Sequence, residues 1–252
     1  MKNNKNLSRN NEYMVYGING AESILSSSRC KVVNIYISES FNFDLIKEKR
    51  LNQFKEKIEI LNKNQFQNKF STFRTQGIVI YFTYKIFSEL DLKESEIIHN
   101  CFLILDSIKD PQNLGQILRT AECAGVDGII LPERRSAKVS NSVFQVSQGA
   151  FCNLDIIISK NIKYSINTLK ENGYWVIGLE NSIESTLWYK TDFSGKIGFV
   201  FGSEGEGIRP LIKKYCDILS TIPMNGRINS LNVSASVSAI LFERNRQLLE
   251  KK

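Results

Sequence analysis

The stretch "KIGFVFGSEGEGIRP", Lys196–Pro210, joins an apolar run to a loop with three glycines and two glutamates. The run predicts a buried strand at 197–202. Glu204 and Glu206 disfavour a phosphate ligand and favour a cation or hydrogen-bond donors. The glycine order G-x-x-G-x-G reverses the dinucleotide fingerprint, and no Lys-Ser/Thr follows as in a phosphate-binding P-loop. The alternative is a plain strand-to-helix turn with Glu206 near the helix N-terminus.

The segments on either side of this loop alternate between strand and helix patterns. Continuous apolar runs such as "CFLILDS" are typical of parallel strands buried on both faces. Such alternation predicts an α/β fold, a parallel sheet covered by helices on both faces. The expected further strands are 101–107, 128–132, 155–159, 174–180 and 217–223, and the expected helices are 113–125, 162–172, 206–215 and one from about residue 231.

The first third of the chain predicts a separate, smaller α/β domain. We expect strands at 32–38 and 76–83, a helix opening near Asn19 and helices within 43–61. The predicted organisation is a disordered tail at 1–11, a domain at 12–86, a partly helical linker at 87–100 and a second domain at 101–252.

Composition narrows the classes of function. The net charge of +7 favours a polyanionic partner such as RNA, bound by folded surfaces because the charge is spread along the chain. Five cysteines without a C-x-x-C pair, and the single His99, argue against disulfides, a metal site or a serine–histidine triad. No apolar run is long enough to span a membrane and no signal core is present, so we expect a soluble cytoplasmic protein.

Two further segments follow predicted strand ends, where α/β sheets bind ligands. In "LDSIKDPQNLGQILRTAECAG", 105–125, a loop delivers Asn113 and a helix carries Arg119. The alternatives are that Asn113 caps the helix and that Arg119 is a solvated helix residue. In "IPMNGRINSLNVSASVSAILFERN", 222–245, a glycine turn leads to a helix of small residues, which suits either a bound ligand or tight helix packing.

In this order and spacing, the three segments resemble the SpoU-type RNA ribose 2'-O-methyltransferases of the SPOUT superfamily. The resemblance spans about residues 100–248, with motifs at 113–121, 201–208 and 222–238. Residues 13–85, with "YGINGAESIL", resemble the L30e/L7Ae-like substrate-binding domain of members that methylate a guanosine ribose in large-subunit (23S) rRNA.

The resemblance implies that S-adenosylmethionine binds in a deep trefoil knot built from about residues 174–240, with no metal. The ligand of the opening loop would then be a nucleoside with a sulfonium cation. Glu180 would lie near the pocket. The implied cofactor-binding residues are Leu179, Gly202, Ile222, Met224, Ser230 and Leu231.

The resemblance also implies four catalytic residues, Asn113, Arg119, Glu204 and Asn232. Arginine is effectively always protonated, so we expect Arg119 to clamp a phosphate or stabilise the developing alkoxide instead of acting as the base. The two asparagines would orient the ribose or hold Arg119, and Glu204 would orient these groups or complement the sulfonium.

The expected partners are RNA and a second copy of the chain, since the family forms homodimers through the catalytic domain. The smaller domain would grip RNA with aromatic and basic side chains. The candidates for that contact are Tyr13, Tyr16, Arg29, Lys31, Phe73 and Arg74.

Methylation of a guanosine in 23S rRNA is the main prediction. The alternatives within the enzyme class are tRNA ribose methylation and methylation of another rRNA site by a resistance-type enzyme. A catalytically silent RNA-binding or ribosome-assembly factor is the alternative outside it. A silent homologue would be expected to lose one of the four catalytic residues, and all are present. The glycine order argues against a nicotinamide-dinucleotide enzyme.

Overall fold

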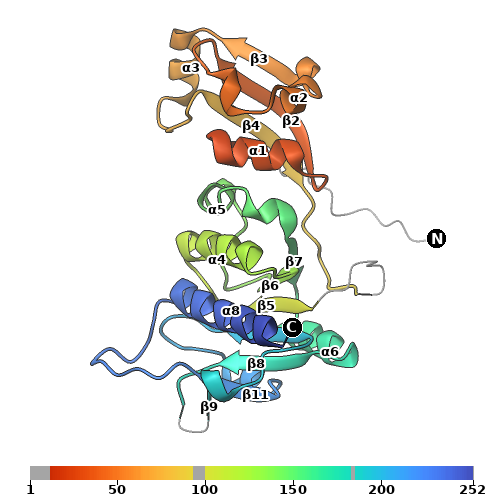
Figure 1. The fold of residues 1–252 in the computed structure, drawn as a ribbon, viewed down its shortest axis with the longest axis vertical. Coiled ribbons are helices and arrows are strands. Elements are labelled where there is room, and N and C mark those ends of the chain that lie inside the picture. The colour runs from red at the N-terminus through yellow and green to blue at the C-terminus, as the bar shows by residue number, and fades with distance from the viewer. Residues whose placement is uncertain (1–11, 93–99, 183–184, 252) are drawn as a thin grey trace, which may run out of the picture. The chain divides into compact units, whose positions relative to one another are not determined.

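The computed structural model describes residues 12–92, 100–182 and 185–251 (Figure 1). Contacts divide the chain into two compact units, residues 1–85 and residues 86–252. The predicted tail at 1–11, His99 and the 93–99 part of the predicted linker lie outside the described residues.

The first unit is a four-stranded sheet in the order β1-β4-β2-β3, in which only β2 and β3 are parallel. Phe66 and Phe70 of the helix α3 pack on Val79 of the sheet. Tyr13 is 5% exposed, so it belongs to the core and is not available to stack on RNA. The elements are β1 Glu12–Tyr16, α1 Ile18–Ser26, β2 Cys30–Ser38, β3 Ile58–Leu61, α3 Lys63–Phe70 and β4 Ile78–Tyr84.

The prediction of helices within residues 43–61 is confirmed only in part. This segment contains only short helical turns, η1 Phe43–Leu45, α2 Glu48–Asn52 and η2 Lys55–Lys57, before the strand β3. The apolar residues of β3 alternate with polar ones and pair in register with β2, Ile58 with Ile35. Pairing with an existing strand therefore overrides the weak helical periodicity.

The second unit confirms the predicted parallel sheet. Its seven strands run in the order β7-β6-β5-β10-β8-β11-β9, and every pairing is parallel. All five residues of β10, the strand of the opening stretch, are buried at the centre. The strands are β5 Cys101–Leu105, β6 Gly128–Pro132, β7 Asp155–Ser159, β8 Trp175–Leu179, β9 Thr186–Leu187, β10 Ile197–Phe201 and β11 Ile218–Thr221.

Helices cover this sheet. The side chains of α6, with Ile212 of α7, pack on alternate strand residues such as Phe102 and Val200. The intervening residues Leu103 and Phe199 are also fully buried, and α4 lies between α5 and α8 (Figure 1). The helices are α4 Pro111–Cys123, α5 Asn141–Val146, α6 Ile162–Glu171, α7 Pro210–Lys213 and α8 Val233–Glu250, with short turns η3 Ala150–Asn153 and η4 Trp188–Lys190.

The predicted helix at 206–215 shortens to the single turn of α7. Pro210 stands at its first position, where the missing N–H is tolerated. The backbone amides of Ile208 and Arg209 instead donate to Glu180 and Asp106, so they are not available for helical hydrogen bonds.

The first part of the predicted linker pairs with the second sheet. Phe87 donates to the Ile156 carbonyl at 2.9 Å and accepts from the Ile158 amide at 2.8 Å, and Leu90 is buried in the same core. Among the described residues, no helix is both long and apolar enough to cross a membrane.

Because the strands of the second sheet are parallel, their carboxyl ends all lie on the same side of the sheet. The loops that follow β5, β8, β10 and β11 therefore lie close together on that side. The three segments with predicted site residues, 105–125, 196–210 and 222–245, all contribute to these loops.

The close packing of α4 on α5 predicts an unusual effect of a glycine substitution. A Cβ on Gly115 would lie 2.5 Å from the Val146 Cβ and 2.9 Å from the Val143 carbonyl oxygen. We expect Gly115→Ala to lose about 1–3 kcal/mol from overpacking, although alanine normally gains about 0.5–1 kcal/mol in a helix.

Urea unfolding followed by tryptophan fluorescence measures this effect, since Trp175 and Trp188 both lie in the second unit. The double variant Gly115→Ala/Val146→Ala should lose less than the sum of the two single variants. An alanine at 115 that stabilises the unit would contradict the packing argument.

Candidate functional site

The glycine loop after β10 folds back on itself. Ser203 and Gly207 exchange both backbone hydrogen bonds, at 3.0 and 3.1 Å, and Gly207 has a positive φ of 67°. A Cβ on Gly202 would lie 1.9 Å from the Gly207 carbonyl carbon. Only glycine fits at 202, so the backbone of the loop is fixed by contact with itself.

An ion pair ties the end of this loop to the neighbouring strand β5. Asp106 is fully buried, and it accepts from the Arg209 Nε at 2.8 and 3.0 Å and from the Arg209 amide at 3.1 Å. The Arg209 guanidinium also bonds Asp106 Oδ1 through a second nitrogen at 2.6 Å. Such a bidentate pair fixes orientation as well as distance.

A second carboxylate holds the loop from the side of β8. Glu180 accepts from the Ile208 amide at 3.2 Å and pairs with Lys213 at 3.0 Å. The sequence places Glu180 near the pocket, and the structure gives its carboxylate a role in fixing the loop.

Three of the four predicted catalytic residues meet in one hydrogen-bonded cluster. The side-chain nitrogen of Asn113, Nδ2, donates to Glu204 Oε1 at 2.8 Å. The Nδ2 of Asn232 donates to the same oxygen at 2.7 Å and to Asn113 Oδ1 at 3.0 Å. Glu204 Oε2 has no hydrogen bond within the described parts of the chain, so it is available to a ligand.

Helix caps position the two asparagines. Asp110, not Asn113, is the N-cap of α4, and it accepts from the Gln112 and Asn113 amides at 3.0 and 3.3 Å. Asn113 therefore keeps its side chain for the cluster. Asn232 caps α8 with its oxygen, which accepts from the Ser234 amide at 2.9 Å, and uses its nitrogen in the cluster.

Arg119 does not join this cluster. It is exposed and lies six residues beyond Asn113 on α4, roughly 9 Å along the helix axis and on another face. It forms no hydrogen bond or ion pair with any residue that the structure describes. Its guanidinium is thus available to solvent or to a bound molecule.

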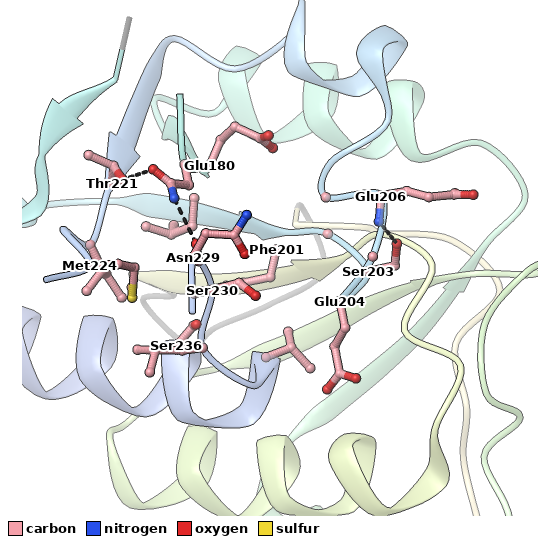
Figure 2. A pocket seen from close by; sticks show the side chains of 18 of the residues that line it. Glu180, Phe201, Ser203, Glu204, Glu206, Thr221, Met224, Asn229, Ser230 and Ser236 are labelled. Carbon is pink, nitrogen blue, oxygen red and sulfur yellow. Dashed lines mark hydrogen bonds between the residues drawn. The ribbon is translucent and has the colours of Figure 1, made fainter. Parts of the chain in front are cut away.

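A cavity of about 290 Å³ opens beside the glycine loop (Figure 2). Figure 2 shows Glu204 on one side of it and Met224, Asn229 and Ser230 on another. Asn181 helps to form it by donating to the Asn229 carbonyl at 2.8 Å. All six residues predicted to bind the cofactor line it: Leu179, Gly202, Ile222, Met224, Ser230 and Leu231.

The lining fits S-adenosylmethionine. The cavity volume is near the lower end of the range for small-molecule sites, roughly 300 Å³. Backbone of the loop at 202–207 is exposed where a side chain at Gly202 would be excluded. Glu204 supplies negative charge in the wall, which suits a sulfonium cation better than a phosphate.

Among the described residues, no three His, Cys, Asp or Glu side chains cluster as a metal site. Burial raises the pKa of the Cys101 and Cys216 thiols to about 12, so both are protonated at neutral pH and are poor nucleophiles.

The sequence interpretation missed the residues that hold the site together. Asp106 and Arg209 stand at the ends of predicted motifs, and a carboxylate directly after a buried strand was the available signal. Ser234, which donates to Gln116 at 2.9 Å, and the contact of Asn181 with Asn229 had no signal in the sequence pattern.

Comparison with known proteins identifies the family of the chain. The model of the SpoU rRNA Methylase family matches residues 100–242, more than half of the chain. The chain is 31% identical over 239 residues to a 23S rRNA (guanosine-2'-O-)-methyltransferase, RlmB, of Shewanella oneidensis, covering 93% of this chain and 97% of that protein. It is 45% identical over 141 residues to a Staphylococcus saprophyticus protein named as a TrmH-family tRNA/rRNA methyltransferase, and this match spans 56% of each chain.

The fold also matches solved structures. The SpoU methyltransferase AviRb from Streptomyces viridochromogenes, crystallised with the cofactor AdoMet, superposes with a TM-score of 0.79. The match covers 95% of this chain and 91% of that one, at 19% sequence identity. It supports the α/β architecture of the chain.

The crowding at Gly202 predicts a loss of cofactor binding. In Gly202→Ala the added methyl group would meet the Gly207 backbone, so the loop must shift, and we expect the affinity for S-adenosylmethionine to fall at least about tenfold. Gly205→Ala is the matched control, since nothing lies within 4 Å of its added Cβ. Isothermal titration compares the two, and equal affinities would contradict this description of the loop.

Proposed function

Because this chain belongs to the SpoU rRNA methylase family, we propose that it methylates the ribose 2'-hydroxyl of a guanosine in large-subunit (23S) rRNA. It is an S-adenosylmethionine-dependent RNA 2'-O-ribose methyltransferase by its family and its relatives. The observation that carries the proposal is the Asn113–Glu204–Asn232 cluster, whose Glu204 lies in the wall of the cavity that suits the cofactor.

The six lining residues predicted from the sequence would hold the cofactor in this cavity, with Gly202 giving close access to the backbone. S-adenosylmethionine supplies, when bound, a methyl group already activated by its sulfonium. The protein therefore has to position the acceptor hydroxyl and stabilise the charge that develops on it.

Glu204 is the group that we assign to the acceptor hydroxyl. Asn113 and Asn232 both donate to its Oε1, which fixes the carboxylate plane and leaves Oε2 to accept a hydrogen bond from the ribose 2'-hydroxyl. Since the two amides belong to α4 and to the cap of α8, the carboxylate is oriented by rigid elements and not by the loop alone.

Arg119 would hold the RNA and not the cofactor loop. Its guanidinium is exposed and without a partner in the described chain, which suits a clamp on a neighbouring phosphate. This role requires no loss of its proton.

The first unit would grip folded RNA as an L30e-like domain. Two contacts support an aromatic and cationic surface on it: Tyr16 lies 5.1 Å from Phe73 between ring centroids, and the Lys69 ammonium lies 3.6 Å from the Tyr36 ring. Such rings and cations suit unstacked bases. We also propose a cytoplasmic homodimer formed through the second unit, with the deep trefoil knot of the family.

Methylation of tRNA is the second candidate, since the staphylococcal relative is named for both tRNA and rRNA. The rRNA assignment is favoured because the alignment with the Shewanella 23S rRNA enzyme runs through both units of this chain.

A map of ribose 2'-O-methylation tests the proposed substrate. Cells with the gene, without it and with Arg119→Ala are compared across all RNAs. We expect the deletion and the variant to lose one mark, on a guanosine of 23S rRNA. Loss of a tRNA mark would overturn the rRNA assignment, and no lost mark would favour a non-catalytic RNA-binding protein.

Asn232→Asp separates the two roles of Asn232. Aspartate still caps α8, so the fold should be retained, but it removes the donor to Glu204 and places a second carboxylate against it. We expect kcat to fall by about a hundredfold or more. Single-turnover methylation measures the rate, and circular dichroism checks the helix. A rate near that of the wild type would exclude the cluster from the reaction.

A further inference from the structure

A second cavity, of about 330 Å³, lies against the same glycine loop. The turn after β5 and the start of α4 form its other walls, with Ser107, Lys109 and Asp110 among them. Five residues line both this cavity and the one assigned to the cofactor: Ser203, Glu204, Gly205, Glu206 and Val233. The two cavities are therefore separated by little more than the loop and the first residue of α8.

Methyl transfer requires the acceptor oxygen to come within roughly 3–3.5 Å of the donor carbon. An acceptor nucleotide must then occupy space that borders the cofactor cavity. The second cavity meets this requirement, and Glu204 stands in the shared wall with Oε2 unbonded in the described chain. We propose that this cavity holds the acceptor guanosine and that the Glu206 carboxylate recognises its base. The inference rests on the proposed function and adds a subsite and a specificity residue to it.

The three carboxylates of this cavity differ in how many of their oxygens are free to accept a hydrogen bond. Asp110 uses both oxygens to cap α4, and Glu204 uses one oxygen for the two asparagines. Glu206 bonds only through its backbone amide, which donates to the Ser203 hydroxyl at 3.3 Å. Its carboxylate has no hydrogen bond or ion pair in the described residues. It is exposed, with two oxygens free to accept.

The position of Glu206 suits a base more than a ribose. Figure 2 shows its side chain directed away from Met224 and Ser230, and the Glu204 side chain leaves the loop in another direction; both residues line the second cavity. A nucleotide whose 2'-hydroxyl approaches Glu204 would extend its base toward Glu206. The exposed Lys109 is the cation of the cavity lining and is available to the flanking phosphate.

The charge of the cavity selects the kind of group that binds beside Glu206. Glu204 and Glu206 disfavour an anionic group beside them, whereas Lys109 is the place in the lining for a phosphate, and the described residues offer no metal cluster to which Glu206 could belong. A lone carboxylate with two free oxygens suits a pair of adjacent hydrogen-bond donors, which it binds in a bidentate manner.

Among the four bases, guanine presents that pair on its Watson–Crick edge, through N1–H and the 2-amino group. Adenine and cytosine place an acceptor beside their donor, and uracil flanks its single donor with acceptors. Each of these three would bring an acceptor against the carboxylate. Reading of the Watson–Crick edge is the usual way in which proteins recognise an unstacked RNA base.

Synthetic hairpins that span the mapped guanosine test this assignment, with guanosine, inosine or adenosine at the acceptor position. Inosine keeps N1–H and lacks the 2-amino group. We expect the wild-type chain to prefer guanosine over inosine in kcat/KM by about tenfold or more, because one charge-assisted hydrogen bond is lost. Adenosine should be a poorer acceptor still.

Glu206→Gln should reduce the preference for guanosine over inosine to within about threefold, because the amide has a single acceptor. It should also improve adenosine relative to guanosine, since a glutamine amide matches a donor beside an acceptor. Glu206→Asp keeps both acceptors and should retain the preference. Glu171→Gln is the matched control, an exposed glutamate at the end of α6 near the opposite ends of the strands.

Wild-type and Glu206→Gln chains with the same guanosine, inosine and adenosine ratios would overturn the assignment of Glu206. So would a wild-type chain that uses inosine as well as guanosine, whatever the variants do. A wild-type chain that methylates no guanosine hairpin would overturn the proposed function, and this inference with it. A preference for guanosine that Glu206→Gln abolishes and Glu206→Asp retains supports the subsite.

Discussion

The pairing of Asp106 with Arg209 is the contact on which the site depends. It joins the end of the central strand pair to the end of the glycine loop, with a carboxylate that has no exposure to solvent. Breaking a buried pair from one side leaves a charge without compensation. The loop between Gly202 and Arg209 is thus held at both ends, by its own backbone at one and by this ion pair at the other.

Rigid support of the loop explains how an exposed carboxylate can act with precision. Glu204 stands at the surface, yet its orientation is set by asparagines from two helices that themselves pack together. The charge near the site also differs in sign from the net charge of the chain. The chain carries a net charge of +7, which suits RNA, but the loops around the two cavities are rich in glutamate. A cationic cofactor and a base with two donors both fit such a local field.

Most of the second sheet was predictable from the sequence because its strands are continuous apolar runs. Such runs are typical of parallel strands that are buried on both faces. The segment at 43–61 was not, since its short turns and the edge strand β3 depend on pairing with Ile35 and its neighbours. The three motifs identify Asn113, Glu204 and Asn232 as candidate catalytic residues. That Asp110 and not Asn113 caps α4 could be seen only in the structure. Hydrogen bonds between loops that are distant in sequence, such as the one from Asn181 to Asn229, cannot be predicted from residue periodicity.

The order of strands in the second sheet has a consequence for synthesis on the ribosome. β5 is made early, but its inner neighbour β10 pairs Ile197 with Cys101 and emerges much later. Until then β5 has an open edge on that side, and such edges invite association with other chains. The wait is shorter in the first unit, because β4, the partner of both β1 and β2, already ends at Tyr84. The nascent protein would therefore carry a finished first unit together with an unfinished sheet, and the unpaired strand edge is exposed longer in the second unit.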